Sequence, residues 1–432
     1  MSENKELKIA IIGAGSTYTP ELMEGIINKH KTLPVRKLYL MDIDERKLDI
    51  VGGLCQRMVE HAGINCEVIL STDLDESIKG ASFVCAQIRV GKLPARVLDE
   101  KIPLKYDLIG QETNGIGGFF KGMRTIPVIM HIVSRMEELC PDAWLINFSN
   151  PSGMIAEAVL NHSKIKMMGL CNVPINTIDG LKKKMELPNA EVEYVGLNHL
   201  AWITAIRQDG VDYLQKAIDE GVNGAVMQNI PQTTFSHDLI RSIGAIPTSY
   251  LIYYYFRDAQ LKKAKEAPKS RGELCMEIEE QLLDIYSNSE INTKPELLSK
   301  RGGARYSEVA INLVDSIYND TNDIQVVNVL NNGAIPFMAD NDAVEVCARI
   351  GRDGAKVIKT TCNNQHIKDY MLMMKAYEKH AVNAALTGDE DEAIRALLIN
   401  PLTGDYNKLK PAFDELKEVH KNFLPQFFKD VK

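Results

Sequence analysis

Three short segments of this chain have residue types that could carry out chemistry, and they lie far apart in the sequence. The first is a Gly-x-Gly turn after an apolar run, of the kind that lets a backbone approach a pyrophosphate at a helix N-terminus. The other two each place one metal-ligating side chain, a thiol or an imidazole, just after an apolar stretch. Together they are consistent with a redox cofactor site followed along the chain by a metal pair, although each segment also has a purely structural interpretation. The segments are Gly13-Ala14-Gly15-Ser16-Thr17-Tyr18, Cys171-Asn172-Val173-Pro174 and Gly196-Leu197-Asn198-His199.

The Gly13–Gly15 turn alone is a weak motif. The third position of the usual dinucleotide fingerprint is occupied by Tyr18, and the first acidic residue after the next apolar run, Asp42, lies 29 positions beyond Gly13. A tight strand-to-helix turn without a cofactor is the alternative. The position of the turn at the start of a strand–helix–strand pattern favours a dinucleotide. Asp42 would accept hydrogen bonds from ribose hydroxyls and repel a 2′-phosphate, which favours NAD over NADP.

Cys171 and His199 are 28 residues apart and cannot share one helix face. They meet only if both lie at the ends of adjacent strands or loops. Spacing leaves two interpretations open: a metal pair, or a buried apolar thiol and a structural imidazole. A thiolate and an imidazole usually indicate zinc. A pair with only two protein ligands leaves positions for substrate oxygens and suits an octahedral metal such as Mn²⁺, although a thiolate is a soft ligand for it.

A tyrosine-rich segment spans residues 246–255 and includes Tyr250. One interpretation is an aromatic face packed against the core, since tyrosine is often half-buried. The other is a tyrosine that acts as a base. Because the reference pKa of tyrosine is about 10, that role needs a metal or an arginine nearby.

Composition excludes several classes of protein. A net charge of −8 with scattered basic residues argues against a nucleic-acid partner. We expect no membrane span, because no stretch of about 18 apolar residues occurs. The polar first residues do not resemble a signal peptide. The eight cysteines form no Cys-x-x-Cys pair, so we expect reduced thiols and a cytoplasmic protein.

The 432-residue length predicts two domains. In the first half, strand-like and helix-like segments alternate, which predicts an α/β fold with a doubly wound parallel sheet. Ligands bind outside the carboxyl ends of such strands. We place a cofactor-binding domain at residues 1–195 and an α+β domain for substrate, metal and oligomerisation at 196–432. The expected strands are 8–12, 37–41, 66–70, 83–89, 144–148, 166–170, 324–329 and 343–349, and the expected helices are 20–29, 45–62, 271–286 and 365–385.

The chain resembles the NAD- and metal-dependent family 4 glycosidases, and among them the 6-phospho-β-glucosidases. The resemblance covers nearly the whole length, and its motifs are highly specific in this order. It implies a Rossmann-like N-terminal domain and a C-terminal α+β domain similar to that of lactate and malate dehydrogenases. The motifs are Gly13-Ala14-Gly15-Ser16-Thr17-Tyr18-Thr19-Pro20-Glu21, Ile109-Gly110-Gln111-Glu112-Thr113, Asn147-Phe148-Ser149-Asn150-Pro151, Cys171-Asn172-Val173-Pro174, Gly196-Leu197-Asn198-His199, Tyr250-Leu251-Ile252-Tyr253-Tyr254 and Lys300-Arg301-Gly302-Gly303.

The resemblance also implies a role for each site residue. Cys171 and His199 are implied as Mn²⁺ ligands, and Tyr250 as the base that abstracts a proton. The implied contacts of NAD are Gly13, Gly15, Ser16, Tyr18 and Asp42, and those of the substrate are Arg96, Asn150 and Arg301. Arginines suit a phosphate because they bind it in a bidentate manner.

Asn172 departs from the phospho-α-glucosidase pattern, in which this position resembles aspartate. An amide cannot protonate a leaving oxygen, so the acid stays unassigned and Asn172 is expected to orient a hydroxyl or a water. The departure favours the β-glucosidase branch.

The implied mechanism differs from that of glycosidases with two carboxylates. NAD⁺ takes a hydride from carbon 3 of the sugar, and the metal acidifies the proton on carbon 2, which Tyr250 removes. The aglycone leaves by elimination, water adds, and NADH returns the hydride. The expected substrates are phosphorylated β-glucosides such as cellobiose 6-phosphate, and the expected assembly is a homodimer or homotetramer.

Three other functions stay open. A phospho-α-glucosidase or α-galacturonidase would share the fold and cofactors. A 2-hydroxyacid dehydrogenase of the lactate/malate type would produce net NADH without Mn²⁺. A non-catalytic NAD sensor would tolerate Cys171→Ser and Tyr250→Phe.

Overall fold

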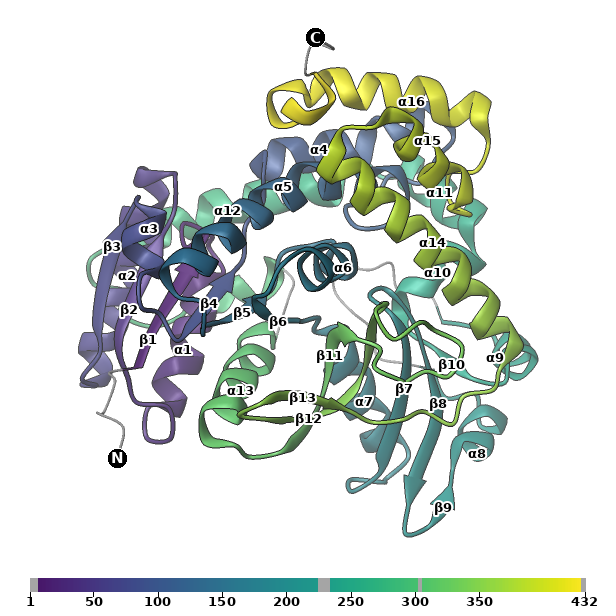
Figure 1. Cartoon of the computed structure of the whole chain (residues 1–432), viewed down its shortest axis with the longest axis horizontal. Coiled ribbons are helices and arrows are strands. Elements are labelled where there is room, and N and C mark those ends of the chain that lie inside the picture. The colour runs from purple at the N-terminus through teal and green to yellow at the C-terminus, as the bar shows by residue number, and fades with distance from the viewer. Residues whose placement is uncertain (1–6, 224–233, 302–304, 429–432) are drawn as a thin grey trace.

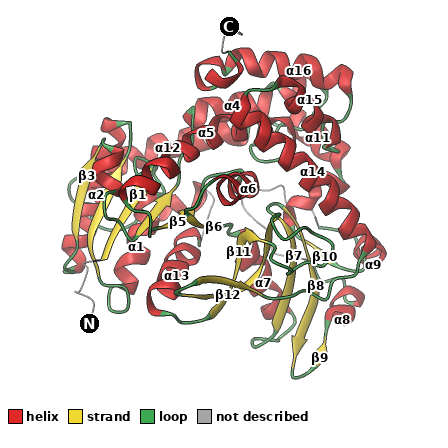
Figure 2. Ribbon diagram, in the orientation of Figure 1, coloured by secondary structure: helices red, strands yellow, loops and turns green. Residues whose placement is uncertain are grey.

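The structure, a computed structural model, describes residues 7–223, 234–301 and 305–428. Its strands form one mixed sheet of 13 strands within these described residues. Helices cover the sheet, and the N-terminal and C-terminal strands occupy separate ends of it (Figures 1 and 2). The α/β fold expected from the alternating segments is confirmed.

The N-terminal part of the sheet is parallel, with strand order β3-β2-β1-β4-β5-β6. This is the order of a Rossmann-like sheet, whose ligand crevice lies where the order reverses, between β1 and β4. The strands are mostly buried apolar runs, as expected for a sheet covered on both faces. They are β1 (Leu7–Ile12), β2 (Val35–Met41), β3 (Glu67–Ser71), β4 (Phe83–Ala86), β5 (Trp144–Asn147) and β6 (Lys166–Gly169).

The C-terminal part of the sheet is antiparallel and continues from β6. Asn328 of β11 pairs with Gly169 of β6, and the order continues as β12-β7-β8-β10. The predicted domain boundary between residues 195 and 196 falls inside β7 and stays a prediction. The strands are β7 (Glu191–Leu197), β8 (Leu200–Gln208), β9 (Val211–Asp212), β10 (Ile246–Pro247), β11 (Asp323–Leu330), β12 (Ala343–Gly351) and β13 (Gly354–Val357).

The four predicted helices are present. They correspond to α1 (Thr19–Lys29), α2 (Glu45–Ala62), α12 (Arg271–Ser287) and α14 (Gln365–Thr387). The other α-helices are α3 (Leu74–Ile78), α4 (Lys92–Lys101), α5 (Gly115–Leu139), α6 (Ser152–His162), α7 (Val173–Lys184), α8 (Leu214–Asp219), α9 (His237–Ile243), α10 (Ile252–Tyr255), α11 (Arg257–Glu266), α13 (Tyr306–Asn319), α15 (Glu390–Ile399) and α16 (Tyr406–Val419). Short 3-10 helices span Pro103–Tyr106, Ser249–Leu251, Glu296–Arg301, Lys421–Phe423 and Pro425–Phe427.

Helix α12 contacts helices α4 and α2, which lie on either side of the carboxyl ends of the parallel strands. It begins with a capping box in which Ser270 and Glu273 bond each other's backbone. The Gly272 amide donates to Glu100 Oε2 of α4 over 2.6 Å, and Lys47 of α2 pairs with Glu279 over 2.6 Å. These contacts hold α12 across the edge where the crevice opens.

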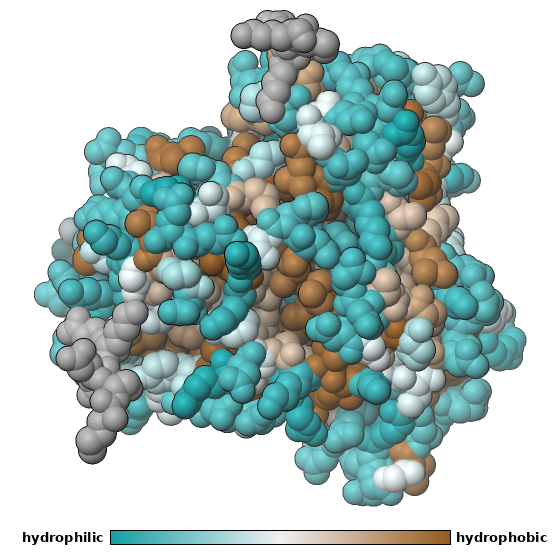
Figure 3. Space-filling model, in the orientation of Figure 1, coloured by the Kyte–Doolittle hydropathy of each residue, from teal (hydrophilic) through white to brown (hydrophobic). Residues whose placement is uncertain are grey.

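The surface seen in Figure 3 is mostly hydrophilic, with apolar patches toward the centre of this face. In the part of the chain that the structure describes, no helix combines the length and the apolar character that crossing a bilayer requires.

Candidate functional site

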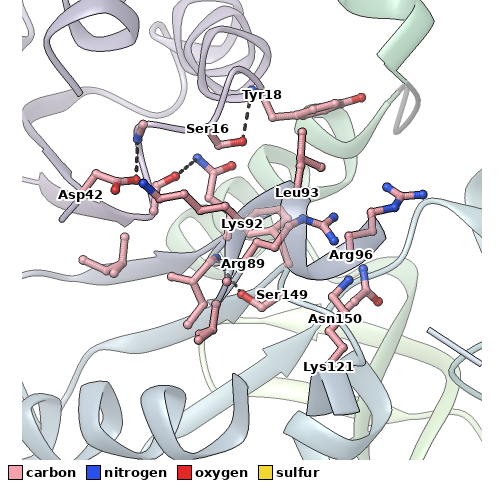
Figure 4. Close-up of a pocket in the computed structure, with 18 of the residues that line it drawn as sticks. Ser16, Tyr18, Asp42, Arg89, Lys92, Leu93, Arg96, Lys121, Ser149 and Asn150 are labelled. Carbon is pink, nitrogen blue, oxygen red and sulfur yellow. Dashed lines mark hydrogen bonds between the residues drawn. The ribbon is translucent and has the colours of Figure 1, made fainter. Parts of the chain in front are cut away.

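One cavity of about 690 Å³ lies at the carboxyl ends of the parallel strands. Figure 4 shows side chains from several loops pointing into it, Asp42 at one end and Arg96 and Asn150 at the other. The strands place these residues there because β1, β2, β4 and β5 all end at this edge. Eleven predicted site residues line it: Gly13, Gly15, Ser16, Tyr18, Asp42, Arg96, Asn150, Asn172, His199, Tyr250 and Arg301.

The Gly-x-Gly turn is tightly bound to the end of β2. Gly13 has φ +88°, and a Cβ there would lie 3.0 Å from the Gln87 carbonyl oxygen, so the turn requires glycine. Gly15 donates its backbone N–H to Asp42 Oδ2 over 2.8 Å, and Asp44 donates to Asp42 Oδ1 over 2.9 Å. The Asp42 carboxylate is thus fixed beside the turn, where it can accept hydrogen bonds from a ribose.

Cys171 and His199 come together as the metal interpretation requires. Cys171 Sγ lies 3.6 Å from His199 Nε2, and both side chains are buried. His199 has φ +67°, a backbone conformation that is uncommon for residues other than glycine. Burial lowers the pKa of His199 to about 3, so the imidazole is neutral at pH 7 and its nitrogen can bind a metal.

The described residues hold no group of three or more His, Cys, Asp and Glu side chains that could bind a metal ion. A metal at Cys171 and His199 would therefore have two protein ligands from this part of the chain. A soft thiolate and a neutral imidazole fit a transition metal, and His199 lines the cavity, so a metal held here could also bind substrate oxygens.

Tyr250 stacks on the imidazole of this pair. The ring centroids of His199 and Tyr250 are 3.8 Å apart, with an interplanar angle of 20°. Tyr250 lies in the 3-10 helix Ser249–Leu251 and lines the cavity, so it is not simply one face of a long aromatic helix. Burial, with smaller contributions from Cys171 and Glu112, raises the pKa of Tyr250 well above its ordinary value.

Glu112 lies at the centre of a cluster of cations in the cavity wall. Its carboxylate pairs with Arg89 at 2.6 Å, with Lys121 at 3.1 Å and with Arg96 at 3.3 Å. Burial acts to raise the pKa of Glu112, but these cations outweigh it and hold the pKa well below its usual range. Three basic side chains share this one carboxylate, and within the described part of the chain only Arg96 among them has a second carboxylate partner, Glu100 at 2.8 Å. The cluster can therefore attract an anionic ligand.

Arg301 and Arg271 form a second cationic wall. The Arg301 guanidinium lies 5.5 Å from the centre of the Tyr18 ring and 3.5 Å from Glu279. Within the described residues, Arg301 Nε and Arg271 Nε are buried without a hydrogen-bond partner, and so is Asn150 Oδ1. Buried polar atoms in a cavity normally find partners, so these three indicate that a polar ligand fits here. Gly302 and Gly303 of the predicted motif lie outside the described residues.

The sequence interpretation missed Lys121, Arg271, Cys275 and Glu279, all of which line the cavity. Lys121 had a detectable signal, because it is a lysine within the apolar run of α5. Arg271, Cys275 and Glu279 of α12 gave no such signal in the sequence, because only the folded chain brings that helix across the crevice. Gln111, which precedes the cavity-lining Glu112, forms a turn: its Oε1 accepts from the Thr113 and Asn114 amides over 2.6 and 2.7 Å.

Comparison with known proteins agrees with this geometry. Residues 8–187 match the family 4 glycosyl hydrolase model, and residues 194–403 match the family 4 glycosyl hydrolase C-terminal domain. A "probable 6-phospho-beta-glucosidase" of Bacillus subtilis (strain 168) is 44% identical over 99% of both chains.

Solved structures show the same relationship. The 6-phospho-beta glucosidase of Thermotoga maritima with manganese, NAD⁺ and glucose-6-phosphate is 31% identical, with a TM-score of 0.88 over 97% of this chain and 99% of that one. A malate dehydrogenase of Plasmodium falciparum shares the fold alone, at 14% identity and a TM-score of 0.54 over 88% of this chain and 98% of that one. This chain belongs to the family 4 glycosyl hydrolases.

Proposed function

We propose that this protein is a 6-phospho-β-glucosidase that uses NAD and a divalent metal such as Mn²⁺. The observation that carries the proposal is that one cavity is lined by the Gly13–Gly15 turn, by His199 and Tyr250, and by Arg96 and Arg301. A dinucleotide, a metal and an anionic sugar would therefore meet in one place. The 6-phospho-β-glucosidase names of its relatives support the same substrate class.

Bound NAD⁺ would supply a reversible hydride acceptor for carbon 3 of the sugar, and a divalent metal would supply a Lewis acid for the adjacent oxygens. Cys171 and His199 would hold the metal. The neutral imidazole of His199 and the thiol of Cys171, 3.6 Å apart, support this assignment. Gly13, Gly15, Ser16, Tyr18 and Asp42 would hold the dinucleotide.

Tyr250 would take the proton from carbon 2 once carbon 3 is a ketone. Its ring stacks on that of His199, which puts its side chain beside the proposed metal ligands. Burial disfavours the phenolate, so the base requires a nearby positive charge, and a divalent cation on His199 would provide one.

The sugar phosphate would bind at the cationic walls of the cavity. Arg96 is buried and aligned by Glu112 and Glu100, and Arg301 keeps a buried Nε without a partner among the described residues. Asn150 Oδ1 is likewise unpaired there and can accept a hydrogen bond from a sugar hydroxyl. We extend the phosphate assignment to Arg271, which lines the same wall.

Asn172 lines the cavity and is buried at the N-terminus of α7. An amide is unable to donate a proton as an acid does, so we propose that it orients a water or hydroxyl. The amide at position 172 favours a β-glucoside 6-phosphate as the substrate. An α-glucoside 6-phosphate is the second candidate, because the relatives include a maltose-6′-phosphate glucosidase at 32% identity.

The test measures p-nitrophenol release from the α- and β-glucoside 6-phosphates, with NAD⁺ and Mn²⁺ supplied together, singly and not at all. We expect release from the β-anomer only when both are present. Equal release in a chelator without NAD⁺ would overturn the cofactor scheme, and a preference for the α-anomer would overturn the substrate assignment. Net accumulation of NADH would instead indicate a dehydrogenase.

We propose a cytoplasmic homodimer or homotetramer, as expected for an enzyme that depends on NAD and acts on phosphorylated sugars. Analytical ultracentrifugation tests the assembly, and a monomer at micromolar concentration would contradict it.

A further inference from the structure

Five apolar residues that line the cavity, and that the contacts below connect to the Asp42 loop, form what we call its apolar lip: Ile43, Val90, Val128, Ile132 and Phe423. Three of these side chains are unusually exposed for their type: Ile43 at 84%, Phe423 at 42% and Val128 at 38%. Contiguous exposed apolar side chains usually mark a binding surface. This surface differs from the opposite end of the cavity, where arginines and Glu112 dominate.

A chain of contacts links the lip to Asp42. Ile43 follows Asp42 directly, and Asp44 pairs with Lys92 of α4 over 2.6 Å. A Cβ on the adjacent Gly91 would lie 3.4 Å from the Phe423 ring. On the other side, Arg124 Nε donates to the Val90 carbonyl over 3.4 Å, which ties the lip to helix α5 one turn before Val128.

Phe423 is held in place by a buried network. His420 Nε2 lies 2.9 Å from Asp99 Oδ1, and Arg124 binds the same carboxylate through two bonds of 2.9 and 2.6 Å. Farther along, Gln426 Nε2 donates to the Met123 carbonyl over 2.9 Å. The C-terminal segment therefore docks on α4 and α5 at fixed points on both sides of Phe423. This residue lies beyond the regions that match the family models, 8–187 and 194–403.

We propose that Phe423 forms one wall of the subsite for the adenine ring of the dinucleotide, together with Ile43, Val90 and Val128. This inference rests on the proposed use of NAD. With the pyrophosphate at the Gly13–Gly15 turn and a ribose at Asp42, the base lies past Asp42, where the lip begins. A flat aromatic base packs favourably against apolar and aromatic side chains.

The polar residues at the lip fit the same ligand. Lys92 and His131 line the cavity here and can contact the nitrogens at the edge of an adenine. The C-terminal segment thus becomes part of the cofactor site, although more than 370 residues separate Phe423 from Asp42 in the sequence. Phe423 is a binding residue, remote from the reacting carbons.

The test measures the Kd values of NAD⁺, ADP-ribose and glucose 6-phosphate by isothermal titration calorimetry for the wild-type protein, Phe423→Ala, Phe423→Trp and Phe428→Ala. Phe428 is the matched control, because it lies in the same segment and is 41% exposed but is not among the residues that line the cavity. We expect Phe423→Ala to raise the Kd of NAD⁺ and of ADP-ribose by the same factor, about 3- to 10-fold.

The other expected results separate a local effect from misfolding. Phe423→Ala should leave the Kd of glucose 6-phosphate unchanged, Phe423→Trp should retain the wild-type Kd of ADP-ribose, and Phe428→Ala should change none of the three values. An unchanged Kd of ADP-ribose in Phe423→Ala would overturn this assignment alone. Failure of the wild-type protein to bind NAD⁺ at all would overturn the proposed function together with it.

Discussion

Burial keeps both rings of the His199–Tyr250 stack uncharged at neutral pH. It lowers the pKa of His199 to about 3 and raises the pKa of Tyr250 well above its ordinary value. The imidazole can therefore bind a metal, whereas the phenol loses its proton only where a positive charge offsets the burial. The neutral imidazole of His199 and the protonated phenol of Tyr250 thus have the same cause, the burial of the stacked pair.

Replacing Tyr250 by phenylalanine tests the base directly. We expect Tyr250→Phe to lower kcat for the β-glucoside 6-phosphate by a factor of about 10² to 10⁴, the usual contribution of a general base, while the Kd of NAD⁺ stays the same. Tyr253→Phe is the control, since Tyr253 is buried nearby, 6.3 Å from Tyr250 between ring centroids, but is not one of the cavity-lining residues. Equal losses of kcat in both variants would indicate damage to packing instead.

Replacing Cys171 by serine tests the metal pair. The hydroxyl is a much poorer ligand for a transition metal than a thiolate, so we expect the Mn²⁺ concentration for half-maximal activity to rise at least tenfold. Titration of the metal-free protein with Mn²⁺ by electron paramagnetic resonance measures the same change without turnover. Cys362→Ser, at a buried thiol away from the cavity, should keep the wild-type Mn²⁺ affinity.

At the residue scale, the sequence predicted the chemistry of the site better than its electrostatics. Spacing left open whether Cys171 and His199 meet, and their 3.6 Å contact agrees with the metal interpretation. The salt bridges of Glu112 with Arg89, Arg96 and Lys121 were beyond prediction, because they join helices α4 and α5 to two loops. Such contacts depend on tertiary packing, which local sequence patterns do not contain.

At the scale of elements, most bounds agree with the expected ones to within two residues. Strand β4 is shorter than expected, ending at Ala86 instead of Arg89. The chain turns there because Gln87 bonds the Gly13 carbonyl and Thr19 Oγ1, while the Ile88 amide donates to Ser149 Oγ. The same bonds that end the strand direct Arg89 into the cavity, so strand propensity alone overestimated its length.

Helix α2 offers a matched pair of glycine substitutions. Gly63 ends the helix at φ +63° with open space around it, whereas Gly53 lies within the helix and an added Cβ there meets only the end of the Arg57 side chain, at 3.5 Å. We expect Gly63→Ala to lower the free energy of unfolding by about 1 kcal/mol and Gly53→Ala to raise it by about 0.5 to 1 kcal/mol. Urea denaturation of the two variants measures both changes, and changes of the same sign would show that the φ of Gly63 does not determine its effect.

At the scale of the whole molecule, the two parts of the sheet are joined near Glu345. This fully buried carboxylate in β12 accepts hydrogen bonds from Tyr194 of β7 over 2.9 Å, Asn328 of β11 over 3.1 Å and Asn198 over 2.9 Å. Burial raises the pKa of Glu345 to about 7 despite these bonds. The sequence did not predict that one sheet would continue through both halves, because the pairing of β11 with β6 joins strands that are more than 150 residues apart.

The raised pKa predicts how stability depends on pH. In the unfolded chain Glu345 ionises near its reference pKa of about 4.3, whereas the folded protein retains the proton up to about pH 7. The contribution of Glu345 to the free energy of unfolding is therefore fully present below pH 4. It falls by about 3 kcal/mol as the pH rises to 7. Glu345→Gln mimics the protonated side chain at every pH. We therefore expect the variant to become increasingly more stable than the wild type, in free energy of unfolding, as the pH rises from 4 to 7. A difference that does not change with pH would contradict the prediction.

We propose that hydrolysis proceeds through abstraction of the proton on carbon 2 within a cavity that also holds a dinucleotide. The most direct measurement is hydrolysis of p-nitrophenyl β-glucoside 6-phosphate in D₂O with NAD⁺ and Mn²⁺, followed by proton NMR of the glucose 6-phosphate produced. We expect deuterium at carbon 2 of the product, formed without net NADH. A product that retains its original proton at carbon 2 would contradict it.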